Sequence, residues 1–241
     1  MKLISVIIIT LNEEKRISNL LKDLSAQTYR NFEVVVVDSN SDDATLEIAE
    51  TFKDSLPALK THNMGERGVS LGRNTGASLA THNRLLFLDA DVRLRPSFLQ
   101  NAMEKLEETK LEVAGVYMGS KGLPVAHKAG YALFNAGLFT TQFFFPTAVG
   151  ACIFSTKRAH DDLKGFDEKI TLCEDCDYVK RASQTWRFRF LPMTFEFDPR
   201  RLDQDGFVST GALYLKANLR RFFFGEMRNQ EMEYKFGHYT S

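Results

Sequence analysis

Ser5-Val6-Ile7-Ile8-Ile9-Thr10, near the start of the chain, is a run of mostly β-branched residues in which apolar and polar side chains do not alternate. A strand that is covered on both faces has this pattern, because neither face meets water. Phe32-Glu33-Val34-Val35-Val36-Val37-Asp38 and Arg84-Leu85-Leu86-Phe87-Leu88 are similar runs. The three runs predict buried strands of one sheet.

Helical patterns separate these strands. Residues 13–24 carry a stripe of apolar side chains at Ile17, Leu20, Leu21 and Leu24, which is typical of a helix with one buried face. We expect further helices over residues 41–52, 69–80 and 97–107, and a weaker strand over 58–62. Strands that alternate with helices in this way predict an α/β fold with a mostly parallel central sheet and helices on both faces.

The second half of the chain is less regular. We expect strands over 113–118, 151–155 and 186–191 and helices over 174–183 and 209–224, whereas the apolar segment 126–145 is ambiguous. No repeat or Pro/Gly-rich linker divides the chain. We therefore expect one domain over residues 1–208, with halves at about 1–118 and 119–208, followed by a C-terminal amphipathic helix and tail over 209–241.

The bulk composition excludes several classes of protein. The chain has 241 residues, and its 31 basic and 31 acidic residues give a net charge of zero, so we expect no nucleic-acid partner. Three cysteines are too few for a disulfide framework. The apolar run at the N-terminus ends at Asn12-Glu13-Glu14, which fits neither a secretory signal nor a transmembrane helix. A cytoplasmic location is the expectation.

Acidic residues follow three of the predicted strands: Glu13, Asp38, and the pair Asp89 and Asp91. Because the carboxyl ends of parallel strands meet at one edge of a sheet, these side chains should converge on one cleft. Paired carboxylates suit a hard divalent cation such as Mn²⁺ or Mg²⁺, which prefers oxygen ligands and often shares them with substrate phosphates. The sequence therefore predicts a metal site beside this cleft.

A set of short motifs between residue 4 and about residue 182 resembles family 2 glycosyltransferases in both order and spacing. The matching segments, each with the family pattern, are Thr10-Leu11-Asn12-Glu13-Glu14 (T-x-N-E-E), Val36-Val37-Asp38-Ser39-Asn40-Ser41-Asp42 (V-D-D-G-S-x-D), Gly72-Arg73-Asn74-Thr75-Gly76 (A-R-N-x-G), Leu86-Phe87-Leu88-Asp89-Ala90-Asp91 (F-L-D-A-D), and Gly165-Phe166-Asp167-Glu168 with Glu174-Asp175-Cys176-Asp177 (G-F-D-E … E-D-x-D). Each motif alone is weak, but the ordered set is specific.

The resemblance implies a GT-A fold, in which residues 1–118 bind a nucleotide-diphosphate sugar and residues 119–208 bind the acceptor. It also implies an inverting transfer to an acceptor hydroxyl, either on a glycan or on a lipid-linked molecule, as in cell-envelope glycan biosynthesis. The implied roles are nucleoside contacts for Thr10, Glu13 and Asp38, a base or diphosphate contact for Arg73, a ribose or metal contact for Asp89, metal binding for Asp91, and the general base for Asp175.

The sequence also departs from the family pattern. Leu11 stands where many relatives have an aromatic residue, and Ser39 replaces the second Asp of the usual pair. No histidine lies between residues 161 and 237 to act as a third metal ligand. Asp198-Pro199-Arg200-Arg201 resembles the S-P-R-R segment of one subgroup, which implies that Arg200 and Arg201 bind the donor diphosphate.

Two other functions remain open from the residues alone. A nucleotidyltransferase that makes sugar nucleotides would share the strand-end carboxylates, but it should have a basic Gly-rich loop where this chain has the acidic segment 10–14. A non-catalytic module that binds nucleotide sugars would not need the Glu174-Asp175 pair. Transfer of a sugar is therefore the leading hypothesis.

The chain has 20 phenylalanines, which cluster at residues 134–145 and 222–224. Such clusters usually belong to a core, and this is the first expectation. The C-terminal helix also carries Lys216, Arg220 and Arg221 beside its apolar residues, a pattern that fits an interfacial helix. Packing on its own domain, a dimer contact and peripheral contact with the inner face of a membrane all remain open.

Overall fold

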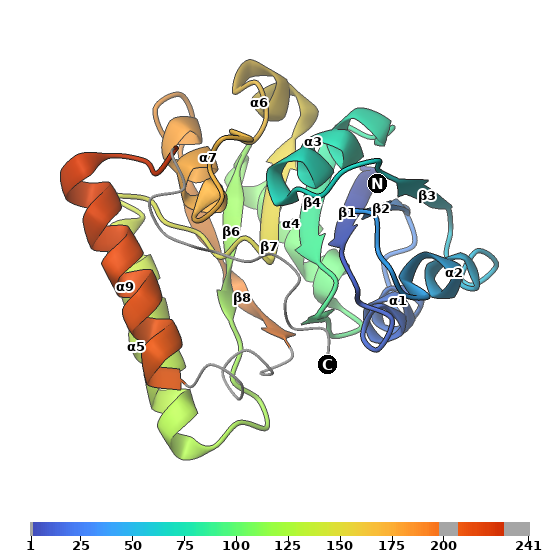
Figure 1. Cartoon of the computed structure of the whole chain (residues 1–241), viewed down its shortest axis with the longest axis horizontal. Coiled ribbons are helices and arrows are strands. Elements are labelled where there is room, and N and C mark those ends of the chain that lie inside the picture. Colours follow the sequence, from blue (N-terminus) through green and yellow to red (C-terminus); the bar gives the residue numbers. More distant parts are fainter. Residues whose placement is uncertain (1, 198–206, 229–241) are drawn as a thin grey trace.

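The computed structural model describes residues 2–197 and 207–228, and these form an α/β fold built around one twisted sheet (Figure 1). The sheet contains eight strands in the order β3-β2-β1-β4-β7-β6-β8-β5 within the described residues. Their bounds are β1 Ile4–Thr10, β2 Phe32–Asp38, β3 Leu59–Asn63, β4 Arg84–Asp89, β5 Val92–Arg93, β6 Ala114–Met118, β7 Cys152–Thr156 and β8 Arg189–Phe197.

Most strands run in the same direction. β1 pairs in parallel with both β2 and β4, and β2 pairs in parallel with β3. β7 is antiparallel to β4 and β6, which leaves β6 and its parallel neighbour β8 aligned with the first four strands. Only β7 and the two-residue β5 are reversed among the described strands. The expected mostly parallel sheet is confirmed.

Helices cover both faces of this sheet, as expected. The helices are α1 Ile17–Ser25, α2 Thr45–Glu50, α3 Val69–Leu79, α4 Phe98–Thr109, α5 Val125–Thr141, α6 Lys157–Asp162, α7 Glu174–Ala182 and α9 Phe207–Phe224. One apolar core joins α1, α2 and α4 to side chains such as Val6 and Leu86. A second core, on the opposite face, joins α3, α6 and α7 to Ile7 and Phe87.

The regular first half follows the expected elements closely, and the differences lie elsewhere. β5 and α6 were not expected, because two and six residues give too little pattern to detect. The ambiguous apolar segment forms α5. The expected boundary at residue 208 falls inside α9, so the division of the chain into a domain and a tail stays a prediction.

The C-terminal helix α9 packs on the start of α7. Ala217 of α9 and Met227 after it share a small buried cluster with Leu172, Cys173 and Cys176. Glu226 reinforces the contact, since its carboxylate pairs with Arg221 at 2.6 Å and with Lys180 of α7 at 2.9 Å. Across the described part of the chain, no helix combines the length and apolar character that crossing a bilayer requires.

Candidate active site

The carboxyl ends of β1, β2 and β4 lie together, as the sequence predicted. Thr10 is in register with Asp38, and Ile9 is in register with Asp89. The loops that follow β1 and β2 are also tied to each other, because the Asn12 N–H donates to Ser41 Oγ at 2.8 Å and the Asp42 N–H donates to Asn12 Oδ1 at 2.8 Å. The structure therefore holds this edge of the sheet as one connected surface.

Asp38 is buried and held firmly at this edge. Its Oδ1 accepts hydrogen bonds from the hydroxyls of Thr10 at 2.7 Å and Ser41 at 2.6 Å, and its Oδ2 accepts from the Ser41 N–H at 2.8 Å. These donors offset the cost of burying a carboxylate. Asp38 is thus preorganised before any ligand binds.

Glu13 lies beside this cluster. Its side chain is 11% exposed and forms an ion pair with Arg16 at 3.6 Å, while its backbone N–H donates to Thr45 Oγ1 at 2.7 Å. Thr45 is the first residue of α2, so the loop after β1 is anchored to the helix after β2. Glu13 and Asp38 therefore border the same surface, as expected.

Arg73 connects this edge to the second half of the chain. Gly76 and Gly72 let α3 lie close against β1, because a Cβ at Gly76 would overlap Ile7 and one at Gly72 would lie 3.1 Å from Ile9 Cγ2. The Arg73 side chain is only 2% exposed, and its Nη1 donates to Glu174 Oε1 at 2.6 Å. Nη2 donates to Asp89 Oδ1 at 3.0 Å and to the Gly150 carbonyl at 3.2 Å.

Glu174 and Asp175 begin helix α7 and border Arg73. Asp175 Oδ1 accepts from the Cys176 N–H at 2.7 Å, as suits a carboxylate at a helix N-terminus. A Cβ added at Gly150 would lie 3.0 Å from Arg73 Nη2 and 3.1 Å from Asp175 Oδ2, so all three groups meet there. The Glu174 carboxylate also reaches the Arg73 guanidinium, so both acids lie beside it.

The electrostatics of this cluster are unusual. Burial would lower the pKa of Arg73, but Asp89, Glu174 and Asp175 together raise it above its ordinary value. Burial, together with nearby Asp175, raises the pKa of Glu174 to about 7 against the attraction of Arg73. Burial also raises the pKa of Asp175, although Arg73 and the Cys176 N–H oppose the rise. Carboxylates with raised pKa values are typical of acid–base sites.

A family comparison shows which family the chain belongs to. The model of the family described as "Glycosyl transferase family 2" matches residues 5–161. The chain belongs to glycosyltransferase family 2. Curated relatives agree: it is 43% identical over 179 residues to the 4,4'-diaponeurosporenoate glycosyltransferase of Staphylococcus haemolyticus, covering 73% of this chain and 45% of that protein.

A second relative is more distant. The chain is 30% identical over 111 residues to glycosyltransferase GlyA of Streptococcus pneumoniae, covering 46% of this chain and 16% of that protein. The chain thus spans less than half the length of either relative.

Solved structures of glycosyltransferases share the fold. S. aureus TarS residues 1–349, in complex with UDP-GlcNAc, matches with a TM-score of 0.66 and 25% identity over 81% of this chain and 58% of that one. A mannosyltransferase from Pyrobaculum calidifontis, in complex with GDP-Man and Mn²⁺, matches with a TM-score of 0.70 and 21% identity over 88% of this chain and 64% of that one. The GT-A fold expected from the sequence is confirmed.

The two carboxylates at the end of β4 offer the oxygen ligands that a divalent cation prefers. Asp89 and Asp91 are both partly exposed there, and the Asp89 side chain is 37% exposed. Residues 2–197 and 207–228 contain no group of three or more His, Cys, Asp or Glu side chains placed to hold a metal ion. Mg²⁺ is commonly bound by one or two carboxylates together with substrate phosphates, so two aspartates suffice.

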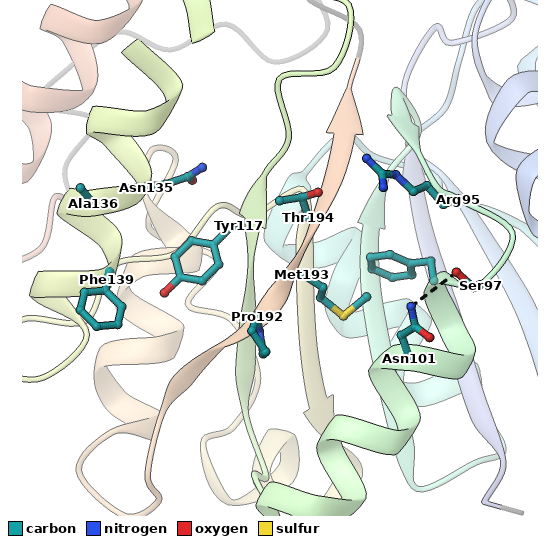
Figure 2. Close-up of a pocket in the computed structure, with 11 residues that line it drawn as sticks. Arg95, Ser97, Asn101, Tyr117, Asn135, Ala136, Phe139, Pro192, Met193 and Thr194 are labelled. Atoms are coloured by element: carbon teal, nitrogen blue, oxygen red, sulfur yellow. Dashed lines mark hydrogen bonds between the residues drawn. The ribbon is translucent and has the colours of Figure 1, made fainter. Parts of the chain in front are cut away.

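A cavity of about 630 Å³ lies between α4 and α5 and is lined by residues from both halves of this family 2 domain (Figure 2). α4 and the loop before it supply Arg95 and Asn101 on one side, and α5 supplies Asn135 and Phe139 on the other. Tyr117 of β6 lines it from the sheet. None of the described site residues predicted from the sequence lines this cavity.

Some residues of the predicted site are not described, and two residues near Arg73 were not predicted. Arg200 and Arg201, with Asp198, lie outside the described residues. Sequence reasoning missed Gly150, which no motif marks, and Phe166, whose ring lies 5.2 Å from the Arg73 guanidinium. Phe166 stands within the Gly165–Glu168 motif, so its position was a usable signal.

Proposed function

We propose that this domain transfers a sugar from a nucleotide-diphosphate sugar to an acceptor hydroxyl with inversion at the transferred carbon. The observation that carries the proposal is the Arg73 bridge, which holds the Glu174-Asp175 pair against the strand-end carboxylate Asp89. A donor site and an acid–base pair would then share one wall. The complex of TarS with UDP-GlcNAc supports a sugar nucleotide as the donor.

The donor would lie across the carboxyl ends of β1, β2 and β4. Thr10, Glu13 and Asp38 are assigned to the nucleoside, because Asp38 is held rigidly by Thr10 and Ser41. Arg73 is assigned to the donor side through Asp89, since its own guanidinium is buried and already bonded. Arg200 and Arg201 are assigned to the diphosphate on the basis of their motif alone.

Asp91, with Asp89, would hold Mn²⁺ or Mg²⁺ in the donor complex. When bound, such an ion neutralises the charge that develops on the departing nucleoside diphosphate. The position of the two aspartates directly after β4 and their partial exposure support this assignment.

Asp175 is proposed as the general base. It would accept the proton of the acceptor hydroxyl as the hydroxyl oxygen attacks the donor carbon from the face opposite the leaving group. Burial raises the pKa of Asp175, which brings its basicity closer to that needed near neutral pH. Glu174 is the less suitable base, because its carboxylate is ion-paired with Arg73 at 2.6 Å.

The acceptor is assigned to residues 119–208 together with the cavity that they share with α4 and β6. The cavity between α4 and α5 combines the aromatic rings of Tyr117 and Phe139 with the amides of Asn101 and Asn135, groups that suit the faces and hydroxyls of a sugar (Figure 2). A glycan or lipid-linked acceptor fits this side. Three buried free cysteines support a cytoplasmic, reducing location.

A thermal-shift panel tests the donor and metal assignments together. We expect one of the UDP-, GDP-, CDP- or dTDP-sugars to raise the melting temperature in the presence of Mn²⁺, because a ligand that binds the folded state stabilises it. Asp91→Ala should lose this Mn²⁺-dependent rise, and Asp54→Ala, an exposed aspartate away from the site, should keep it.

Two results would count against the proposal. An unchanged Mn²⁺-dependent shift in Asp91→Ala would remove the metal assignment. Absence of a shift with every sugar nucleotide, in a chain that is folded by circular dichroism, would remove the donor class.

A further inference from the structure

The exposed apolar surface of the protein is concentrated on two helices. Eleven of the thirteen large hydrophobic side chains that are exposed in the described residues lie in or directly after α5, or in α9. They are Val125, Leu133, Phe134, Phe139, Phe143, Phe144, Leu215, Leu219, Phe222, Phe223 and Phe224, which we call the α5–α9 face. The expectation that the Phe clusters belong to the core is therefore wrong for most of their members, because α5 and α9 lie outside the sheet with their outer sides uncovered.

An aromatic contact connects the end of α5 to α9. The Phe145 ring, which follows α5, packs edge-to-face on Phe222 of α9 with 5.1 Å between ring centroids, and the Arg221 guanidinium lies over the same Phe145 ring. The outer side of α9 also forms a shallow apolar hollow of about 380 Å³ that includes Leu219 and Phe223. The segment after α5 is thus in direct contact with the end of α9, next to exposed side chains of both helices.

The charges on these two helices all have one sign. α5 and α9 contain 17 and 18 residues and carry no aspartate or glutamate, although the whole chain has 31 acidic residues. Their charged side chains are Lys128, Lys216, Arg220 and Arg221, and Arg221 is buried and paired with Glu226. Lys128 and Lys216 are exposed beside the apolar residues.

We propose that the α5–α9 face docks on the surface of a bilayer that contains anionic lipids. Apolar side chains on helices whose own charged residues are all cations match such a surface, because the rings and leucines enter the boundary of the acyl chains while the lysines meet the anionic headgroups. A second copy of the chain would be a poorer partner, because a symmetric contact would bring the same cations together. The docked helices lie along the membrane surface and do not cross it.

Docking would place the reaction next to the lipid. The inner side of α9 packs through Ala217 on Leu172, Cys173 and Cys176, which flank the Glu174-Asp175 pair. A helix that rests on the membrane by one side and on α7 by the other would favour an acceptor carried on a lipid. This last step rests on the proposed function, whereas the docking itself does not.

Co-sedimentation with vesicles tests the docking. We expect the chain to bind vesicles of phosphatidylcholine with phosphatidylglycerol and to bind those of phosphatidylcholine alone less well. Leu219→Asp/Phe223→Asp should weaken partitioning by at least about tenfold, since each lost apolar insertion removes a large part of the binding free energy. Lys128→Glu/Lys216→Glu should weaken it by about tenfold on the anionic vesicles, with a smaller effect on the neutral ones.

The matched control is Leu3→Asp/Leu79→Asp, which changes the two exposed leucines outside this face and should leave vesicle binding unchanged. The proposal is overturned if Leu219→Asp/Phe223→Asp binds vesicles as tightly as the wild type while keeping its melting temperature. It is also overturned if sedimentation velocity shows a dimer that this double substitution dissociates, because the face would then be an interface between copies.

The same samples separate this proposal from the proposed function. Vesicle binding is measured without donor or acceptor, and donor binding is measured by thermal shift without lipid. A chain that binds vesicles but is not stabilised by any sugar nucleotide would keep the docking and lose the transfer. A chain with the reverse behaviour would lose the docking and keep the transfer.

Discussion

Two glutamates with little exposure to solvent lie in different surroundings in this fold. Glu33, near the start of β2, accepts hydrogen bonds from the Ser5 hydroxyl at 2.6 Å and from the N–H and hydroxyl of Thr81 at 2.6 and 2.7 Å. Lys60 pairs with its other oxygen at 3.0 Å. Burial acts to raise the pKa of Glu33, but these donors outweigh it and hold the pKa at about 2. Glu174 is largely buried, with a side chain that is 12% exposed, and its pKa is raised to about 7, because loss of solvent outweighs the help of Arg73.

The difference lies in how many donors each carboxylate receives. Glu33 has fixed hydroxyl, amide and ammonium donors to itself, whereas Arg73 serves Glu174 and Asp89 and also lies beside Asp175. The amino end of the parallel strands therefore holds a stable charge that supports the fold. The pair at the start of α7, which Arg73 links to the carboxyl end, holds charges that are costly to keep, and this is the condition under which a carboxylate takes up a proton readily.

The largest expected effect is on the reaction itself. Asp175→Asn should slow transfer by about 10²–10⁴-fold, because the amide cannot accept the acceptor proton, and should leave donor binding intact. Turnover would be followed as release of the nucleoside diphosphate, with the donor that stabilises the chain most. Glu33→Gln is the matched control at the other end of the sheet: below its melting temperature it should keep near wild-type turnover. Wild-type turnover in Asp175→Asn would assign the base elsewhere.

The next effect is on stability and concerns the shared cation. Arg73→Met should lower the free energy of unfolding by about 3–5 kcal/mol, because it leaves Glu174 buried without its partner. Arg67→Met, which removes the exposed Arg67–Asp42 pair, should cost no more than about 1 kcal/mol. Urea titrations of both variants measure the contrast. Equal losses would mean that the buried bridge is no stronger than a surface ion pair.

The strands and their terminal aspartates could be predicted from the sequence, whereas the contact between Arg73 and Glu174 could not. The β-branched runs of β1 and β2 and the apolar run of β4 predicted the sheet, since an unbroken apolar strand has few alternatives, and Asp38 and Asp89 at their ends were predicted with them. The bridge from Arg73 to Glu174 joins residues 101 positions apart, and no local pattern encodes such a contact. Motifs placed both residues near the site without showing that they touch.

The exposure of helices α5 and α9 was harder to predict from the sequence. The composition of α5 is apolar on nearly all sides, which is equally typical of a buried strand, a buried helix and a helix on a lipid surface. Burial depends on which elements lie over a segment, and this follows from the order of the strands and the positions of the crossovers. The Phe clusters were therefore visible in the sequence, but their exposure was not.

A smaller effect should separate the two glutamates directly. Glu33→Gln should destabilise the fold by about 2–3 kcal/mol at neutral pH, because three hydrogen bonds and Lys60 lose their charged acceptor. Glu174→Gln should change stability by less than about 1 kcal/mol, because the amide oxygen still accepts from Arg73 and the buried charge is gone. Chemical denaturation of the two single variants gives the comparison. A larger loss in Glu174→Gln would place the more strongly stabilised charge at the carboxyl end.

The smallest effect is a difference in pH dependence, and its sign follows from the two pKa values. For Glu174 the folded-state pKa of about 7 lies above the ordinary 4.5, so the folded state binds the extra proton between these values and stability falls as the pH rises through that window. For Glu33 the folded-state pKa of about 2 lies below 4.5, so the unfolded state binds the extra proton and stability falls as the pH drops from 4.5 towards 2. Relative to the wild type, Glu174→Gln should therefore gain on the order of 1 kcal/mol between pH 4.5 and 7, and Glu33→Gln should gain a similar amount as the pH falls below 4.5. Free energies of unfolding measured across both windows test this, and a Glu174→Gln difference that stays flat from pH 4.5 to 7 would show that the wild-type side chain is ionised throughout, as Glu33 is.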